Sequence, residues 1–270
     1  MLGAIIGDIA GSEYEARATK DNRAPLLGRD AHFTDDTVLT VAVADALLHR
    51  TPARWHIMEG KSAHASYAQH IRAYGRRFPH AGYGQQFQVW LASDATRGYG
   101  SYGNGAAMRA SPIGLAAPSL EWAMREARWS AEVTHSHPQG VRGAQAVAAA
   151  VFLARSGESK ASIRAQIARR FGYRLDTPLE RIRPDYRFDS SAQGSVPQAM
   201  IAFFESEDYE DAIRNAISLG GDSDTQACIA GAVAQAFYRS LPQPWVETVR
   251  LRLDSGFRQV IDLFAQRFPL

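Results

Sequence analysis

The 270-residue chain has a single cysteine, Cys228, which excludes an intramolecular disulfide framework. Its neighbours are small and apolar, so we expect a buried structural thiol and a reducing, cytoplasmic location. The chain also lacks an excess of charge, because 30 Lys and Arg against 28 Asp and Glu leave a formal charge of +2. No chain-wide field therefore favours nucleic acid or an anionic membrane as a partner.

Long apolar runs are absent as well. Residues 1–10 are apolar but contain Asp8 and lack a positively charged leader, which is not typical of a signal peptide. Elsewhere, charges interrupt each apolar stretch before the roughly 20 residues that a membrane-spanning helix needs. The 46% of hydrophobic residues can still bury a substantial core. We therefore expect one monomeric domain over residues 1–270, with no membrane segment.

Apolar residues recur at helical spacing along the chain, and strict alternation is missing. The clearest stretches are Val38–Leu48, Val141–Ala154 and Ile229–Tyr238. Val141–Ala154 is apolar nearly all round and rich in small side chains, which predicts a helix at the centre of a bundle. The pattern predicts an all-α fold.

Two further segments give local predictions. Ser195, followed by Pro197 and Gln198, offers an N-cap, a first-turn proline and a capping-box partner, so we expect a helix to begin there. The segment Arg174–Gly194 mixes Pro, Asp, Arg and Ser without periodicity. We interpret it as a long surface connection within the domain.

Two acidic clusters stand where a loop meets an apolar helical stretch: Phe-Thr-Asp-Asp-Thr at residues 33–37 and Gly-Gly-Asp-Ser-Asp-Thr at residues 220–225. Either cluster alone is explained by helix capping, in which Asp and Thr accept bonds from free N–H groups. Together they hold more carboxylates than caps use, and a buried unpaired charge is costly. A shared cation would relieve that cost.

The oxygen ligands of such a site suit Mg²⁺, or Mn²⁺ as a substitute, better than zinc, which prefers Cys and His. Calcium is disfavoured because no EF-hand loop is present. Two metal ions are an option for this number of ligands. The predicted ligands are Thr34, Asp35, Asp36, Asp222, Asp224 and Thr225.

The first segment of the chain places glycines at every fourth position, Gly3, Gly7 and Gly11, which gives a smooth helix face for close packing. Asp8 in this helix is either a buried carboxylate that ties down a helix end or a residue that orients a ligand. Glu15 follows where we expect the helix to end. It is either a solvated surface acid or a carboxylate that reaches into the site from a loop.

A glycine-rich loop at residues 98–105 matches G-x-G-x-x-G, but no strand precedes it and no βαβ unit follows. The loop is either an ordinary surface turn or a cradle whose N–H groups approach phosphates while a tyrosine stacks on a base. No Walker lysine follows it, so nucleotide hydrolysis is not indicated. His135 and His137 are too few for a metal site, and we expect His135 to bond a polar group.

These motifs together resemble the ADP-ribosylglycohydrolase family, which includes the dinitrogenase reductase-activating glycohydrolases. Four blocks occur in the family's order along nearly the whole chain: residues 7–15, 33–37, 103–109 and 220–225. The resemblance implies a compact orthogonal helical bundle with two Mg²⁺ ions at the floor of a cleft. It also implies that Glu15 lies on a mobile loop that closes over the cleft.

By the same resemblance, we expect the substrate-binding residues to surround a ribose and a diphosphate. Segments 79–98 and 174–194 are expected to frame the leaving group. The expected catalytic carboxylates, one of which accepts a proton from water, are Glu15, Asp35 and Asp36. The expected substrate-binding residues are Asp8, Gly100, Ser101, Tyr102, Gly103, Asn104, Gly105 and His135.

The implied reaction is hydrolysis at the anomeric carbon of the distal ribose, which frees a modified protein side chain, for which we expect arginine. Two alternatives remain open at this point. One is a module that binds ADP-ribose or neutralises an ADP-ribosylating toxin without turnover. The other is removal of ADP-ribose from nucleic acid, which the near-neutral charge disfavours.

Overall fold

The computed structural model describes residues 1–49, 56–95 and 97–270. These residues form helices and no strand, apart from an antiparallel bridge between Gly103 and Ser191. The helices in chain order are α1 (Leu2–Glu15), α2 (Asp35–His49), α3 (His56–Arg77), α4 (Gln85–Ala92), α5 (Gly105–Met108), α6 (Ser111–Ala116), α7 (Leu120–Glu132), α8 (Pro138–Arg155), α9 (Lys160–Phe171), α10 (Leu179–Ile182), α11 (Ala192–Phe204), α12 (Tyr209–Ile217), α13 (Ser223–Tyr238), α14 (Gln243–Arg252) and α15 (Ser255–Arg267).

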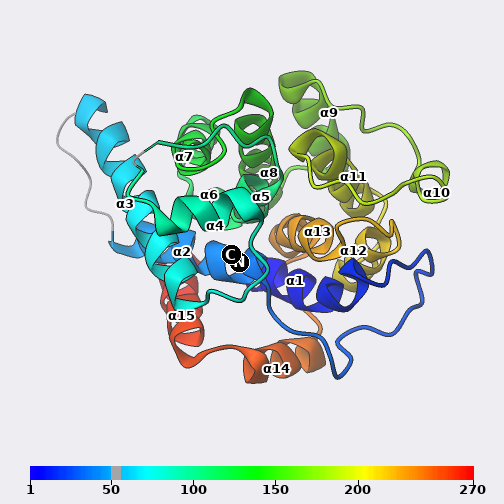
Figure 1. The fold of residues 1–270 in the computed structure, drawn as a ribbon. Coiled ribbons are helices and arrows are strands. Elements are labelled where there is room, and N and C mark those ends of the chain that lie inside the picture. Colours follow the sequence, from blue (N-terminus) through cyan, green and yellow to red (C-terminus); the bar gives the residue numbers. More distant parts are fainter. Residues whose placement is uncertain (50–55, 96) are drawn as a thin grey trace.

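Helices α1 and α13 pack directly against each other in the middle of the molecule (Figure 1). Three glycines of α1 make this possible. A Cβ added to Gly3 would lie 2.7 Å from the carbonyl oxygen of Gly231, and one added to Gly7 or Gly11 would overlap the α13 backbone itself. The prediction of a smooth glycine face is confirmed, and the close contact brings the end of α1 beside the start of α13.

Helix α8 is buried along most of its length and contacts α5, α6, α7, α9, α11 and α13. Its central position confirms the prediction from its small apolar side chains. The helices cross one another in several directions (Figure 1), so the all-α orthogonal bundle is confirmed. Cys228 on α13 is fully buried, as expected. Within the described residues, no helix combines the length and apolar character that a membrane span requires.

Helix α11 begins one turn earlier than predicted. Ser191 is its N-cap and accepts a hydrogen bond from the Gly194 N–H at 3.1 Å, while Pro197 lies inside the helix. The predicted start at Ser195 is wrong because the Ser195 hydroxyl donates back to the Ser191 carbonyl at 2.8 Å instead of capping. The side-chain Oε1 of Gln198 has no hydrogen-bond partner among the described residues, so no capping box forms.

The segment Arg174–Gly194 connects α9 to α11, as predicted, but it contains the short helix α10 and is anchored to the core. The Tyr186 hydroxyl donates to the Gly194 carbonyl at 2.7 Å and accepts from Gln226 Nε2 at 2.9 Å. Lys20 Nζ donates to the Tyr186 carbonyl at 2.7 Å. These bonds fix the position of the residues that follow Tyr186 in the chain.

Candidate active site

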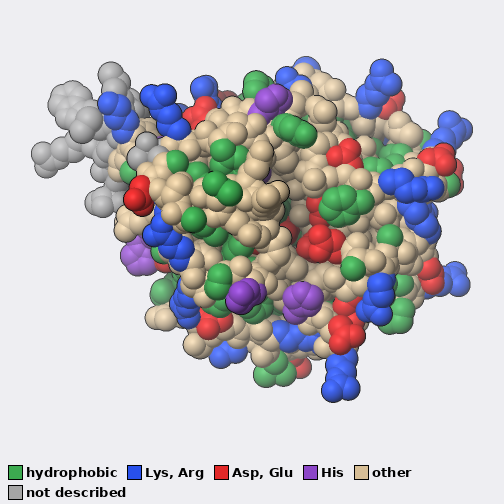
Figure 2. All heavy atoms as spheres, viewed as in Figure 1, with side chains coloured by type: hydrophobic (Ala, Val, Ile, Leu, Met, Phe, Trp, Pro, Cys, Tyr) green, Lys and Arg blue, Asp and Glu red, His purple; other side chains and the backbone are tan. Residues whose placement is uncertain are grey.

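An acidic cleft opens on the face shown in Figure 2, where Asp and Glu side chains gather beside a hollow near the centre. The cavity has a volume of about 400 Å³. Its floor comes from the amino-terminal ends of α2 and α13. Its walls include Gly82, residues 84–87, Tyr99, Ser101, residues 103–105, Phe188 and Ser190.

Asp8 holds the start of α2 in place from α1. Its side chain is fully buried and accepts hydrogen bonds from the backbone N–H groups of Thr34 and Thr37, both at 3.0 Å. It also accepts from both hydroxyls, with Thr34 Oγ1 at 2.7 Å from Oδ1. The Thr34 hydroxyl gives its proton to Asp8 and accepts from the Asp36 N–H at 3.3 Å, so one lone pair remains available for another partner. Asp8 therefore orients the first acidic cluster from beneath the cleft.

Asp222 occupies the N-cap position of α13, but its side chain makes no capping bond. Its Oδ2 accepts instead from Asn104 Nδ2 at 2.8 Å, which turns the carboxylate toward the cleft. Asp224 accepts from the Thr225 N–H at 2.8 Å. The Thr225 hydroxyl donates to Asp36 Oδ2 at 3.2 Å, so the two acidic clusters meet across the floor. Capping alone does not account for Asp222.

The carboxylates converge in two overlapping groups, each with oxygens within 4.8 Å of one another. Asp35 lines the same cleft without belonging to either group. The groups are Asp8 with Asp36 and Asp224, and Glu15 with Asp222 and Asp224.

Burial and mutual repulsion disfavour the charged forms of these acids. Burial, followed by the charges of Asp8 and Asp35, raises the pKa of Asp36 well above its usual range. Burial, followed by the charge of Asp36, does the same to the pKa of Asp224. Burial, followed by the charge of Asp8, raises the pKa of Asp35 to about 8. A bound cation would reverse each of these effects, because it favours the ionised carboxylates.

The side chains fit a hard divalent cation. Asp36 Oδ1 is buried and has no hydrogen-bond partner among the described residues, which is costly unless another ligand meets it. The converging donors are all oxygens, as Mg²⁺ and Mn²⁺ prefer. The site therefore has the donor chemistry that the sequence predicted, with an unsatisfied oxygen at its centre.

The glycine-rich loop depends on two of its glycines. Gly100 has a φ of +76°, a backbone conformation that side chains rarely tolerate, and its N–H donates to Ser136 Oγ at 3.2 Å. A Cβ added to Gly105 would lie 3.1 Å from Nε2 of His135. Gly100 is therefore required by its backbone conformation, while the absence of a side chain at Gly105 lets the backbone there lie directly against His135 at the cleft.

His135 is held in one orientation and kept neutral. Arg109 Nη2 donates to Thr134 Oγ1 at 2.9 Å, which leaves the Thr134 hydroxyl proton for His135 Nδ1 at 2.7 Å. Burial, followed by the charge of Arg109, lowers the pKa of His135 well below its usual range. The neutral ring then carries its hydrogen on Nε2, where it can donate to an oxygen in the cleft.

Most of the predicted site residues meet in this cleft. Asp8 and Thr34 lie beneath its floor, and Gly100 and Tyr102 lie outside its lining. The Tyr102 side chain is 58% exposed at the rim. The predicted residues that line the cleft are Glu15, Asp35, Asp36, Ser101, Gly103, Asn104, Gly105, His135, Asp222, Asp224 and Thr225.

Glu15 corrects one expectation. It is the last residue of α1 and does not lie on a loop. The helix continues past Gly11 because that glycine packs on the start of α13, so Glu15 reaches Asp222 and Asp224 from a helix end. Burial, followed by the charge of Asp222, raises its pKa.

No sequence pattern specifically predicts several wall residues. Tyr99, Phe188 and Ser190 line the cleft, as does the fully buried Arg109, which lies in the block at residues 103–109 but was not among the predicted site residues. Their segments were expected to frame the site, but no pattern singles out these residues. Only the folded chain shows that Phe188 and Ser190 face the acidic clusters.

Comparisons with known proteins show the family of the chain. A model of the ADP-ribosylglycohydrolase family matches residues 1–269. The chain is 29% identical to the human ADP-ribosylhydrolase ARH3, over 92% of this chain and 87% of that protein. It is 26% identical to the ADP-ribosylarginine hydrolase Tri1 of Pseudomonas putida, over 92% of this chain and 72% of that protein.

A solved structure described as an ADP-ribosylglycohydrolase-related protein complex shares the fold, with a TM-score of 0.67 and 24% identity. The match covers 98% of this chain and 95% of that one. The chain therefore belongs to the ADP-ribosylglycohydrolase family and is an ADP-ribosylhydrolase.

Proposed function

We propose that the protein is a magnesium-dependent hydrolase that removes ADP-ribose from a modified protein side chain, with arginine as the expected attachment point. The observation that carries this proposal is the convergence of two acidic clusters on the floor of one cleft, beside a glycine-rich wall. The name of the relative Tri1, an ADP-ribosylarginine hydrolase, supports the choice of arginine.

The floor of the cleft would hold two Mg²⁺ ions. Bound there, the ions supply an anchor for the ribose hydroxyls and polarise a water molecule. Asp8 contributes from below by fixing the Thr34 hydroxyl, and Asn104 contributes from the wall by fixing Asp222. The proposed ligands are Thr34, Asp35, Asp36, Asp222, Asp224 and Thr225.

The wall of the cleft would bind the rest of ADP-ribose. The loop at residues 100–105 offers backbone N–H groups to the diphosphate, and the Nε2–H of His135 donates to a ribose or phosphate oxygen. Tyr102, exposed at the rim, stacks on the adenine. Because His135 stays neutral, it serves as a hydrogen-bond donor without adding a charge beside the acidic floor.

The reaction cleaves the bond between the distal ribose anomeric carbon and the side-chain nitrogen or oxygen, through a transition state of oxocarbenium character. Water supplies a hydroxyl to the anomeric carbon and a proton to a carboxylate, and the leaving side chain takes up a proton. Asp36 is 1% exposed, which suits a metal ligand better than a group that accepts a proton from water. We assign acceptance of this proton to either Glu15 or Asp35, whose side chains remain accessible from the cleft.

The test is release of free ADP-ribose from peptides modified on arginine or on serine, with Mg²⁺ or with EDTA. We expect release from the arginine peptide with Mg²⁺, no release with EDTA, and none from the double variant Asp35→Ala/Asp36→Ala. Release in EDTA, or by the double variant, would contradict the metal-dependent mechanism. Release from the serine peptide alone would keep the mechanism and replace the proposed linkage.

A further inference from the structure

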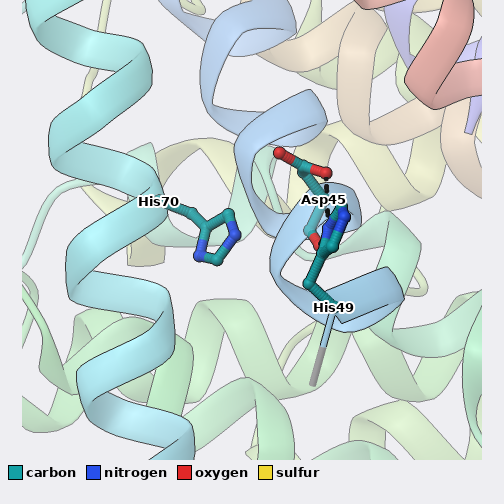
Figure 3. Close-up of side chains that lie close together, drawn as sticks. All are labelled: Asp45, His49 and His70. Atoms are coloured by element: carbon teal, nitrogen blue, oxygen red, sulfur yellow. Dashed lines mark hydrogen bonds and ion pairs between the residues drawn. The ribbon is translucent and has the colours of Figure 1, made fainter. Parts of the chain in front are cut away.

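A second group of potential metal ligands lies outside the acidic cleft, between α2 and α3. Asp45 and His49 are on α2, and His70 points toward them from α3 (Figure 3). One ligand atom from each lies within 4.8 Å of the other two. Asp45 and His49 are four residues apart, so both project from one face of the helix.

Asp45 and His49 are already arranged as adjacent ligands. His49 Nδ1 lies 2.9 Å from Asp45 Oδ1. Zinc bonds of about 2.0–2.1 Å in a tetrahedral site place two ligand atoms about 3.3 Å apart. His49 Nδ1 also lies 3.0 Å from the backbone carbonyl oxygen of Asp45. A carbonyl only accepts, so Nδ1 carries a hydrogen, and a metal ion that binds there takes the place of that hydrogen and separates the pair slightly.

His70 is oriented by its own helix. Its Nδ1 lies 2.8 Å from the carbonyl oxygen of Ser66. A carbonyl only accepts, so Nδ1 carries the hydrogen and Nε2 keeps a free lone pair. Metal-binding histidines typically donate their second ring N–H to a carbonyl or carboxylate in this way. The ring of His70 faces the Asp45 and His49 pair (Figure 3), as a third ligand would.

Asp45 has an orienting partner as well. The Tyr74 hydroxyl donates to Asp45 Oδ2 at 2.9 Å, and the Tyr74 ring stacks on Phe257 at 6.1 Å between centroids. The Asp45 side chain is 17% exposed, while His49 is 67% exposed. Tyr74 therefore fixes Asp45. The exposed His49 is held through Nδ1 contacts with Asp45, and its ring must move by roughly 1.5 Å for the three ligand atoms to meet one ion.

We propose that Asp45, His49 and His70 bind a divalent transition-metal ion, represented by Zn²⁺, that links α2 to α3. Two imidazoles and one carboxylate suit Zn²⁺ and its neighbours in the first transition row, and water completes the coordination. The all-oxygen clusters of the cleft suit Mg²⁺ instead. The two sites thus differ in the metals they select.

The proposed site is independent of the hydrolytic one. Asp45 lies ten residues after Asp35 on the same helix, about 15 Å along its axis at 1.5 Å per residue. The ion would tie the carboxyl end of α2 to the middle of α3. Its role would be to stabilise the helix whose other end carries the catalytic carboxylates.

The test is Zn²⁺ binding by competition with a chromophoric chelator, on protein stripped with EDTA and then saturated with Mg²⁺ to fill the cleft. We expect wild-type protein to bind Zn²⁺, and His49→Gln and His70→Gln to bind it about 100-fold more weakly or not at all. His64→Gln, on α3 but outside the group, is the matched control and should bind as wild type does.

Two further measurements keep the test decisive. Zn²⁺ should raise the Tm of the wild type and of His64→Gln, but not that of His70→Gln. Tyr74→Phe keeps the ring and loses the hydroxyl that orients Asp45, so it should bind Zn²⁺ about tenfold more weakly. No Zn²⁺ binding by the wild type, or unchanged binding by both His49→Gln and His70→Gln, would overturn the proposal.

Discussion

The packing of α1 on α13 predicts that Gly7→Ala destabilises the protein. A Cβ on Gly7 would overlap the carbonyl group of Ala227 and lie 2.8 Å from the backbone nitrogen of Cys228. These are backbone atoms of a buried helix, which cannot rotate away as a side chain can. The two helices must therefore separate to accommodate one methyl group.

Helix propensity alone would predict the opposite effect of Gly7→Ala on stability. In an open helix, replacing Gly by Ala stabilises by about 1 kcal/mol. Forcing a methyl group into a packed interface costs about 1–3 kcal/mol and occasionally more, and rigid backbone neighbours place Gly7 at the upper end. We expect a net loss of about 2 kcal/mol, which corresponds to a Tm lower by about 4–8 °C for a chain of this size.

Thermal and urea denaturation of Gly7→Ala measure this loss, with Gly75→Ala on α3 as the matched control. The three atoms nearest to a Cβ on Gly75 all belong to the side chain of Leu91, and the nearest, at 2.6 Å, is a terminal methyl that can rotate away. The control should therefore stay within about 1 kcal/mol of the wild type. A Gly7→Ala protein as stable as the wild type would refute the account of the α1 and α13 contact.

Three other predictions concern the cleft. Without metal, the free energy of unfolding should fall as the pH rises from about 4 to about 8, because the pKa of Asp35 is raised from 3.8 to about 8 on folding and the protonated form is favoured. We count half of that pKa shift because Asp35 borders solvent, which gives a loss of stability of about 3 kcal/mol. Urea titrations at each pH measure this loss, and a free energy of unfolding that does not change with pH would contradict it. Asn104→Ala removes the donor to Asp222 and should lower kcat/KM about tenfold or more, and an unchanged value would show that this bond does not position Asp222. Tyr102→Ala should raise KM about tenfold with kcat nearly unchanged, which initial rates on ADP-ribosylated peptides measure, and equal KM values would exclude stacking.

Much of the fold followed from local patterns. The spacing of Gly3, Gly7 and Gly11 predicted close helix packing, and the small apolar side chains of α8 predicted its central place. The start of α11 was missed because Ser191 and Ser195 are equally good N-caps by residue type. The choice between them depends on the Ser195 hydroxyl, which bonds to the Ser191 carbonyl.

The acidic floor was also predictable in composition, since two Asp and Thr clusters hold more carboxylates than helix capping uses. Which groups meet was not predictable, because the bond between Thr225 and Asp36 joins distant parts of the chain. The wall residue Phe188 and the helical position of Glu15 depend on how segments pack. No local sequence pattern predicts that Phe188 lines the cleft or that Glu15 lies in a helix.

The central claim is that the acidic clusters hold the metal that hydrolysis requires. Turnover of an ADP-ribosyl-arginine peptide by Asp36→Ala, beside wild-type protein at saturating Mg²⁺, tests it most directly. Asp36 carries the buried oxygen without a hydrogen-bond partner among the described residues, so its loss should reduce kcat about 100-fold or more. Near-normal turnover by a folded Asp36→Ala protein would contradict the account.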